Sequence, residues 1–422
     1  MANNIVNSLR KHVVLIGKTN SGKSTLFNAL TGQDNAIVSE TAGTTTDPVG
    51  KAMELLPFGP IFLVDTAGLG DTSDLGEERM KKTHIACRRG DAFLYVANSN
   101  DFDEDDYLAF AGKKRPHLLI FTEINTATDS AAIAAKPLTT DSPTTAQDSP
   151  TTMQDSQATT RERLFVAYPH ALTFAENGDP IEIRSALSAL LSELEPDDGY
   201  MIGDLIPYNS NVIFVIPVDS EAPKGRIILP QVQLLRECLD HGIRSYVVRD
   251  SELEDAIATL GEASIRLVVT DSQAFAYVNQ IVPDSVQLTS FSILLARQKG
   301  NITQLLEGVD AFAHLPDGAK ILMLEGCTHN HTHEDIGRVK IPKLLKEQTG
   351  KTFDFQFFSG YDFPSDLSPY AAAIQCGNCM INRREAFARL EELTAANIPV
   401  TNYGLMLAWV NGILERATEL FR

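Results

Sequence analysis

The segment Gly17-Lys18-Thr19-Asn20-Ser21-Gly22-Lys23-Ser24 matches the pattern GxxxxGKS in full. An apolar run, Val13–Ile16, precedes it, and an apolar pattern typical of a helix, Thr25–Leu30, follows it. This order places the segment between a strand and a helix, where its glycines let successive backbone N–H groups surround phosphate oxygens. The Lys23 ammonium is expected to reach the β- and γ-phosphates, and the Ser24 hydroxyl to bind Mg²⁺. The predicted nucleotide contacts in this segment are Gly17, Asn20, Ser21, Gly22, Lys23, Ser24 and Thr25.

Two further motifs follow in the order of a nucleotide-hydrolysing domain. Asp65-Thr66-Ala67-Gly68 comes directly after the apolar run Ile61–Val64. We therefore expect Asp65 near Mg²⁺, and we expect Gly68 to approach the γ-phosphate with its N–H. Gly43-Thr44-Thr45-Thr46-Asp47 lies between the two motifs, where a switch loop supplies a threonine to the metal ion.

The order and spacing of these motifs resemble the tRNA-modification and Era-like group of GTPases. The resemblance implies that Thr45 binds Mg²⁺ and that Asn20 accompanies activation by K⁺. By its offset from the DTAG motif, Glu77 resembles the catalytic glutamate of the tRNA-modification GTPases; the alternative is an exposed carboxylate on a helix. Leu69 stands where other GTPases place a glutamine that orients the attacking water, so hydrolysis is expected to be slow.

The motif that reads the base departs from the pattern of that group. An NKxD sequence is expected after the apolar run Leu118–Phe121, and Thr122-Glu123-Ile124-Asn125 stands there instead. The Asn125 side chain can accept one hydrogen bond from guanine, but its own amide donor meets the second guanine donor. Because a mismatched polar contact costs about 1–3 kcal/mol, the sequence predicts nucleotide binding more firmly than guanine specificity.

Composition and charge exclude several classes of protein. The 422 residues are 43% hydrophobic and 22% charged, as in globular domains, and the charge sum 36 − 55 = −19 argues against nucleic acid as a partner. No apolar run approaches the roughly 20 residues of a membrane span. The beginning of the chain has no apolar run of signal-peptide length, and five cysteines are too few for a disulfide scaffold. These features predict a cytoplasmic protein without a membrane role.

The pattern along the chain predicts an α/β protein of three domains. Strand-like runs alternate with helical patterns over 1–198, which we interpret as a mostly parallel sheet with helices on both faces. A second α/β stretch covers 199–283, with strands expected at 211–218, 246–248 and 265–270, and a third covers 284–422. Residues 126–161 include the repeats DSPTTAQ and DSPTTMQ, which lack apolar residues and predict a disordered insertion. A phosphorylated regulatory segment is the alternative.

A constellation of cysteines and histidines marks the third domain. Cys376-Gly377-Asn378-Cys379 follows the apolar run 370–374, and Cys327-Thr328-His329 precedes it by a long gap. A CxxC turn directs two thiolates at one metal, and Cys327 with His329 could complete a Cys₃His zinc site or an iron–sulfur cluster. Spacing leaves both open, and three unrelated cysteines remain the plain alternative. Cys87 and Cys238 lie on helical patterns and are predicted to be core residues.

Six longer stretches carry a further resemblance: residues 219–231, 270–275, 288–300, 327–342, 375–380 and 401–404. They resemble the HydF family, the GTPase and scaffold of FeFe-hydrogenase maturation. The resemblance implies a GTPase domain, a dimerisation domain and an iron–sulfur cluster domain. It also implies a 4Fe–4S cluster held by Cys327, Cys376 and Cys379, with Gln375 in place of the family histidine. The fourth position is then open, bound to water or taken by His329.

The same resemblance implies a function and partners. A homodimer would bind GTP, hydrolyse it slowly, and carry a diiron precursor from two radical-SAM maturases to the apo-hydrogenase. Two other functions stay open: a tRNA-modification type of GTPase with a structural zinc, and a cluster-binding protein whose GTPase domain has decayed at the base-reading loop. Under the first function, the predicted catalytic residues are Lys23, Thr45, Asp65 and Glu77.

Overall fold

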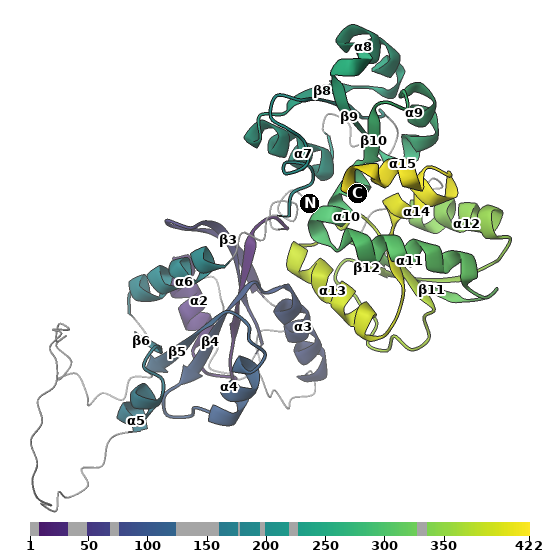
Figure 1. The fold of residues 1–422 in the computed structure, drawn as a ribbon. Coiled ribbons are helices and arrows are strands. Elements are labelled where there is room, and N and C mark those ends of the chain that lie inside the picture. The colour runs from purple at the N-terminus through teal and green to yellow at the C-terminus, as the bar shows by residue number, and fades with distance from the viewer. Residues whose placement is uncertain are drawn as a thin grey trace, which may run out of the picture. The chain divides into compact units, whose positions relative to one another are not determined.

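The computed structural model describes residues 8–32, 49–67, 76–123, 160–175, 178–194, 199–218, 227–326 and 336–422 (Figure 1). The chain divides into two compact units. The first unit is Lys11–Glu195, and the second unit is Pro196–Arg422 together with Met1–Arg10. Within the described ranges, no helix is long and apolar enough to cross a membrane.

The first unit contains a six-stranded sheet in the order β2-β3-β1-β4-β5-β6. Neighbouring strands run parallel, except that β2 pairs with β3 in the antiparallel direction. Its strands are β1 (Lys11–Ile16), β2 (Val49–Leu55), β3 (Gly59–Asp65), β4 (Ala92–Asn98), β5 (His117–Glu123) and β6 (Leu172–Ala175). Its helices are α2 (Lys23–Thr31), α3 (Gly76–Arg89), α4 (Glu104–Ala111), α5 (Thr160–Ala167) and α6 (Ile181–Glu193).

Helices cover both faces of this sheet because successive residues of each strand point to opposite sides. Val13 and Leu15 of β1 pack into a core with residues of α2 and α6. Val14 and Ile16 pack into a second core with residues of α3, α4 and α5. Because the central strands run parallel, their carboxyl ends lie together at one edge of the sheet, where the loop after β1 begins.

The second unit contains two four-stranded sheets, and all paired strands in both run parallel. One sheet has the strand order β10-β9-β7-β8. Its strands are β7 (Asn211–Val215), β8 (Arg244–Val248), β9 (Ile265–Thr270) and β10 (Gln287–Ser290). The other sheet has the strand order β12-β11-β13-β14. Its strands are β11 (Lys320–Glu325), β12 (Asp354–Ser359), β13 (Ala372–Gln375) and β14 (Val400–Asn402).

Helices of the second unit pack on both sheets and join their cores. One apolar cluster contains Ile213 of the first of these sheets and Leu322 of the other, so the two sheets share a core. The helices are α7 (Leu229–Asp240), α8 (Leu253–Leu260), α9 (Phe275–Ile281), α10 (Phe291–Lys299), α11 (Ile302–His314), α12 (Ile341–Thr349), α13 (Arg383–Ala395), α14 (Tyr403–Val410) and α15 (Leu414–Thr418). A π-helical turn, Ile336–Lys340, precedes α12.

The α/β class predicted from the sequence is confirmed, with one strand shorter than expected. The strand expected at 211–218 ends at Val215, because Pro217 has no N–H with which to extend a hydrogen-bonded ladder. The boundary expected between 283 and 284 lies just before β10, which pairs with β9. The insertion expected at 126–161 lies outside the described residues, except for its last two residues, which begin α5.

A buried ion pair fixes α13 in the second unit. Arg389 Nε donates to Glu385 Oε1 at 2.8 Å, and neither side chain is exposed to solvent. Arg389 Nη2 also donates to the carbonyl of Gly360, at 2.7 Å, in the chain after β12. Because both charges are out of water, each depends on the other for compensation.

We predict that Arg389→Met lowers the free energy of unfolding of the second unit by roughly 3–5 kcal/mol, because it leaves the Glu385 charge buried. Trp409, the single tryptophan, lies in α14, so its fluorescence during urea unfolding reports on this unit. Arg236→Met is the matched control, since it breaks the exposed pair with Asp240 at the same spacing. Equal midpoints for the two variants would contradict the prediction.

Candidate functional site

The loop between β1 and α2 is held by the lysine of the GxxxxGKS pattern. Lys23 Nζ donates to the carbonyls of Gly17, at 3.0 Å, and Lys18, at 2.6 Å. The Lys23 side chain is buried, and burial lowers the pKa of its ammonium to about 8, against the opposing effect of the Asp65 carboxylate. Phosphate oxygens are stronger acceptors than these carbonyls, so the ammonium is available to a phosphate that enters the loop.

The two invariant glycines of the pattern are required by the backbone of this loop. Gly17 has a φ of +147°, and a Cβ there would lie 2.0 Å from the carbonyl oxygen of Val96. Gly22 has a φ of +87° and packs against Thr122 at the end of β5. The Thr122 hydroxyl donates to the carbonyl of Ser21 at 2.8 Å, which ties the loop to the neighbouring strand.

A hydroxyl and a carboxylate meet where Mg²⁺ is expected. Ser24 Oγ, in the first turn of α2, donates to Oδ2 of Asp65 at 2.6 Å. Burial raises the pKa of the Asp65 carboxyl group, and the hydrogen bond from Ser24 opposes that shift. Asp65 Oδ1 is buried and has no hydrogen-bond partner among the described residues. Two oxygen ligands of this kind fit Mg²⁺, which keeps several waters and substrate oxygens as its remaining ligands.

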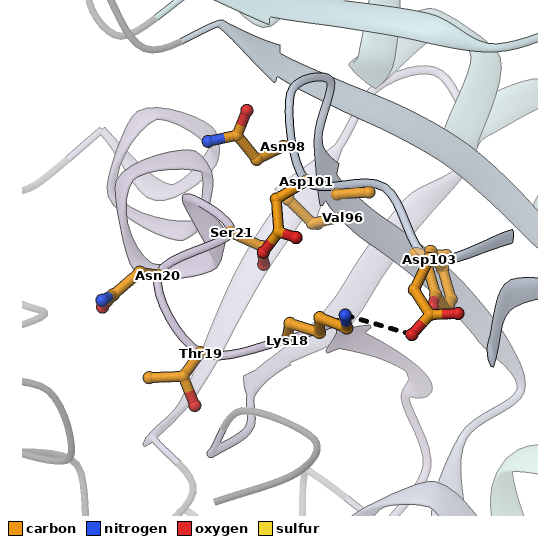
Figure 2. Close-up of a pocket in the computed structure, with 10 residues that line it drawn as sticks. Lys18, Thr19, Asn20, Ser21, Val96, Asn98, Asp101 and Asp103 are labelled. Carbon is orange, nitrogen blue, oxygen red and sulfur yellow. Dashed lines mark ion pairs between the residues drawn. The ribbon is translucent and has the colours of Figure 1, made fainter. Parts of the chain in front are cut away.

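A pocket adjoins the same loop on the side of β4 (Figure 2). It is lined by residues 18–21 of the loop and by the end of β4 with the residues that follow it. Figure 2 shows the Lys18 side chain extended toward Asp103, and the two form an ion pair at 3.1 Å. Both side chains are substantially exposed, so this pair contributes little to stability.

The predicted nucleotide residues are thus partly gathered in one place. Residues 17 and 20–25 form the loop and the start of α2, and Asp65 ends β3 beside Ser24. Asn20 adopts a left-handed conformation, with a φ of 63°. Thr45, Gly68, Leu69 and Asn125 lie outside the described residues. Glu77 lies in α3, and its side chain is not among those described.

A second candidate site lies in the second unit, after β13. Cys376 directly follows this strand, and both Cys376 and Cys379 are half-buried. Two backbone N–H groups donate to Cys376 Sγ, that of Gly326 at 3.0 Å and that of Asn378 at 3.3 Å. N–H donors directed at sulfur stabilise a thiolate and tune a metal bound to it.

The topology of the sheet explains why Gly326 contacts Cys376. The chain leaves β11, forms β12 on one side, and then returns to β13 on the other side. The carboxyl ends of β11 and β13 therefore lie side by side at a topological switch point, where ligands of parallel α/β sheets bind. Leu324 pairs with Gln375 in the register, and Gly326 follows two residues later. Cys327 comes next in the sequence and lies outside the described residues, as does His329.

An ion pair joins the two sides of the segment that contains Cys327. Glu325 ends β11, and Arg338 lies in the π-helical turn; Arg338 Nη2 donates to Glu325 Oε2 at 3.0 Å. Glu325 also accepts a hydrogen bond from Ser359 at 3.2 Å, and the Arg338 guanidinium lies 4.2 Å from the centre of the Phe357 ring. Glu325 at the end of β11 and Arg338 in the π-helical turn are thus held to each other.

The turn between the two cysteines is held by a buried lysine. Lys299 Nζ, at the end of α10, donates to the carbonyls of Asn378 at 2.8 Å and Ile381 at 2.7 Å, and more weakly to that of Cys379 at 3.4 Å. Burial lowers the pKa of the Lys299 ammonium to about 8, while the two cysteines raise it. Asn378 has a φ of 54°, and its side-chain amide donates to Gln375 Oε1 at 3.1 Å.

The chemistry of these residues fits a metal centre with thiolate ligands. Two thiols, N–H donors to sulfur and a buried cation lie together, although no group of three metal-ligating side chains occurs within the described part of the chain. The sequence did not point to Gly326, Asn378 or Lys299. A lysine at the end of a helix that begins with an apolar run, eight residues after the start of α10, was the one available signal. The other two cysteines, Cys87 and Cys238, lie in α3 and α7 as predicted.

Cys238 is fully buried in the core and Cys87 is half-buried. Burial raises the pKa of each thiol to about 11. Both are therefore poor nucleophiles and poor metal ligands near neutral pH.

Models of known families match three parts of the chain. The model described as a 50S ribosome-binding GTPase matches residues 12–123. The hydrogen maturase F dimerization domain matches residues 201–300, and the hydrogen maturase F tetramerization domain matches residues 303–420.

Single proteins match a part of the chain. The tRNA modification GTPase MnmE of Chromobacterium violaceum is 35% identical over 127 residues, which are 29% of this chain and 28% of MnmE. MnmE of Xanthomonas oryzae pv. oryzae is 47% identical over 91 residues, which are 21% of this chain and 20% of that MnmE. The chain thus spans less than a third of the length of these relatives.

Two solved structures are similar at low sequence identity. Era of Aquifex aeolicus is 15% identical with a TM-score of 0.33, covering 59% of this chain and 98% of Era. The G domain of T. maritima FeoB is 19% identical with a TM-score of 0.27, covering 44% of this chain and 99% of that domain.

The domain matches follow one another in the order expected from the sequence. Residues 12–123 form a GTPase domain, which implies GTP and Mg²⁺ as its ligands. The two hydrogen maturase F domains cover residues 201–420 almost without a gap. This combination confirms the resemblance inferred from the sequence. The chain belongs to the hydrogen maturase F family and carries a GTPase domain before the two domains that define it.

Proposed function

We propose that this chain is a GTP-binding scaffold of FeFe-hydrogenase maturation that carries a 4Fe–4S cluster. It receives a diiron precursor from radical-SAM maturases and delivers it to the apo-hydrogenase. The observation that carries the proposal is the arrangement at the switch point of the last sheet, where Cys376 accepts a hydrogen bond from the residue before Cys327. The match of residues 201–420 to hydrogen maturase F domains supports it.

Cys327, Cys376 and Cys379 are the proposed cluster ligands. The two described cysteines lie on a short turn, and the third follows Gly326, whose N–H reaches Cys376 Sγ. Gln375 is buried and its amide oxygen accepts from Asn378, so it is not the fourth ligand. That position is left to His329 or to an exchangeable group. A bound cluster would supply an iron atom with an exchangeable site, which suits a protein that accepts and releases a precursor.

The GTPase domain is the proposed switch. Lys23 and the N–H groups of the loop would hold the phosphates, with Ser24, Thr45 and Asp65 near Mg²⁺. Glu77 is the proposed catalytic carboxylate, Asn20 would serve a K⁺ ion, and Gly68 would contact the γ-phosphate. With Leu69 unable to orient water, hydrolysis is slow, which suits a switch that changes partner affinity rather than a rapid enzyme.

The alternative is a tRNA-modification type of GTPase with a structural zinc. The MnmE matches favour it for the GTPase domain alone, since they cover less than a third of MnmE. The net charge of −19 opposes binding to RNA, and the hydrogen maturase F domains occupy the rest of the chain. The metal content of the protein separates the two functions.

Iron content tests the proposal directly. After anaerobic reconstitution with iron and sulfide, we predict about four irons per chain and the EPR signal of a reduced 4Fe–4S cluster. Cys376→Ala removes a thiolate ligand and should abolish the signal. Cys87→Ser is the control, since Cys87 lies in α3 of the first unit, and it should retain the wild-type iron content. Zinc uptake without iron uptake would refute the cluster and favour the alternative.

The pKa of Lys23 predicts a pH dependence of GTP binding. Without nucleotide, the ammonium loses its proton above about pH 8, and only the charged form attracts phosphate. We therefore expect GTP affinity to fall roughly 25-fold between pH 7.5 and pH 9.5, with proton uptake on binding. Isothermal titration in two buffers of different ionisation enthalpy measures both. Lys23→Arg stays charged and should lose the pH dependence; an unchanged dependence would disprove the assignment to Lys23.

An exposed edge supports self-association through the second unit. In the described part of the chain, β8 has a neighbouring strand on one side only. Its Tyr246 and Val247 side chains are 36% and 49% exposed, and Leu239 at the end of α7 is 68% exposed. An unpaired apolar edge pairs readily with another strand, so we propose that two copies associate here as a homodimer.

We predict that Val247→Lys shifts the chain toward the monomer, because an edge lysine opposes strand pairing. Analytical ultracentrifugation over a range of concentrations measures this shift. Val166→Lys is the matched control, since Val166 is an exposed valine of α5 in the first unit. If both variants keep the oligomeric state of the wild type, the association uses another surface.

A further inference from the structure

We propose that Lys299 is a positioning residue of the thiolate site, which fixes the CxxC turn and supplies the positive charge that balances its thiolates. This inference rests on the cluster proposed above. It concerns a residue outside the cysteine motifs, on a helix that the dimerization-domain match includes rather than the tetramerization-domain match.

The hydrogen bonds of Lys299 all go to one segment. Its ammonium has three donors, and the acceptors are the carbonyls of Asn378, Cys379 and Ile381. These carbonyls belong to the CxxC turn and to the two residues after it. Because the three acceptors surround one ammonium, Lys299 is a main support of this turn, beside the hydroxyls of Ser8 and Tyr361, which donate to the carbonyls of Cys379 and Met380.

The helix that presents Lys299 is itself rigid. Phe291, Leu294 and Leu295 of α10 pack into a buried cluster together with strands of the β10-β9-β7-β8 sheet, and Cys379 packs against the same cluster. A Cβ on Gly377 would lie 3.3 Å from Leu295 Cδ1, so α10 and the CxxC turn are in close contact. Lys299 is the last residue of α10, where the helix dipole favours a cation.

In the part of the chain that the structure describes, no carboxylate pairs with Lys299. Its side chain is 4% exposed, and none of the ion pairs found among the described residues includes it. A buried charge with only neutral acceptors is costly. The CxxC turn lies directly at this lysine: Lys299 Nζ donates to the carbonyl of Cys379, and the Cys379 side chain packs against the cluster that contains residues of α10. A buried cation beside two cysteines is therefore complementary to an anionic thiolate centre.

This charge has a consequence for a cluster held by thiolates. Reduction adds one negative charge, and a fixed cation nearby stabilises the reduced form more than the oxidised form. Removing the cation should therefore lower the reduction potential. The hydrogen bonds have a separate consequence that needs no metal. Without them, the amides of the CxxC turn should exchange their hydrogens faster in the apoprotein.

Two substitutions separate the charge from the hydrogen bonds. Lys299→Gln removes the charge and keeps an N–H₂ donor, whereas Lys299→Met removes both. Lys343→Met, an exposed lysine of α12, is the matched control. In the full chain, hydrogen exchange of a peptide spanning residues 374–382 is measured on the apoprotein. Iron content and the reduction potential are measured after reconstitution with iron and sulfide.

We expect faster exchange of the 374–382 peptide in Lys299→Met, and reduced iron retention. For both Lys299 variants, we expect the ratio of reduced to oxidised cluster at a fixed potential to fall roughly tenfold, equivalent to about 59 mV for one electron. Lys343→Met should match the wild type in all three measurements. Wild-type exchange and potential in both Lys299 variants would overturn the inference. Loss of both sheets in either variant would also contradict it, because the role is confined to one turn.

The design distinguishes a failure of this inference from a failure of the proposed function. If the wild-type chain takes up no iron, the cluster proposal fails, and the exchange of the apoprotein still decides whether Lys299 fixes the turn. If the wild-type chain binds about four irons while the Lys299 variants behave identically to it, the cluster stands and the role of Lys299 is refuted.

Discussion

The parallel pairing of β11 with β13 is the constraint on which the thiolate site depends. It sets Leu324 opposite Gln375, and the next residues along each strand bring the Gly326 N–H to Cys376 Sγ. The two strands are neighbours only because the chain forms β12 on the other side of β11 before it returns. Segments about 50 residues apart in the sequence are thereby joined at one edge of a sheet, with their carboxyl ends together.

The nucleotide loop was predictable from the sequence because its chemistry is local. The predicted phosphate-binding residues lie within nine positions, and the backbone needs glycine at positions 17 and 22 because φ is positive at both. Asp65 required one more step, since an apolar run before it identified the strand that carries it. The strand β2 gave no such signal, because its residues alternate between half-buried and exposed positions at the edge of the sheet.

The sequence predicts ligands for the proposed thiolate site, but it does not predict the residues that support them. A CxxC pattern shows which side chains can bind a metal, whereas Lys299 and Arg338 act over separations that only the fold brings together. Lys299 lies 79 residues from Asn378 in the sequence, and its helix begins as an ordinary apolar pattern. Such residues are found from burial and unbalanced charge, which are properties of the packed chain rather than of any short motif.

The two sites are connected by a short stretch of chain at the start of the first unit. Ser8 belongs to the second unit and donates through Oγ to the carbonyl of Cys379 at 3.2 Å. Three residues later Lys11 begins β1, and β1 ends at Ile16, directly before the phosphate-binding loop. Residues 8–16 therefore join a contact of the CxxC turn, at Ser8, to the strand that ends directly before Gly17.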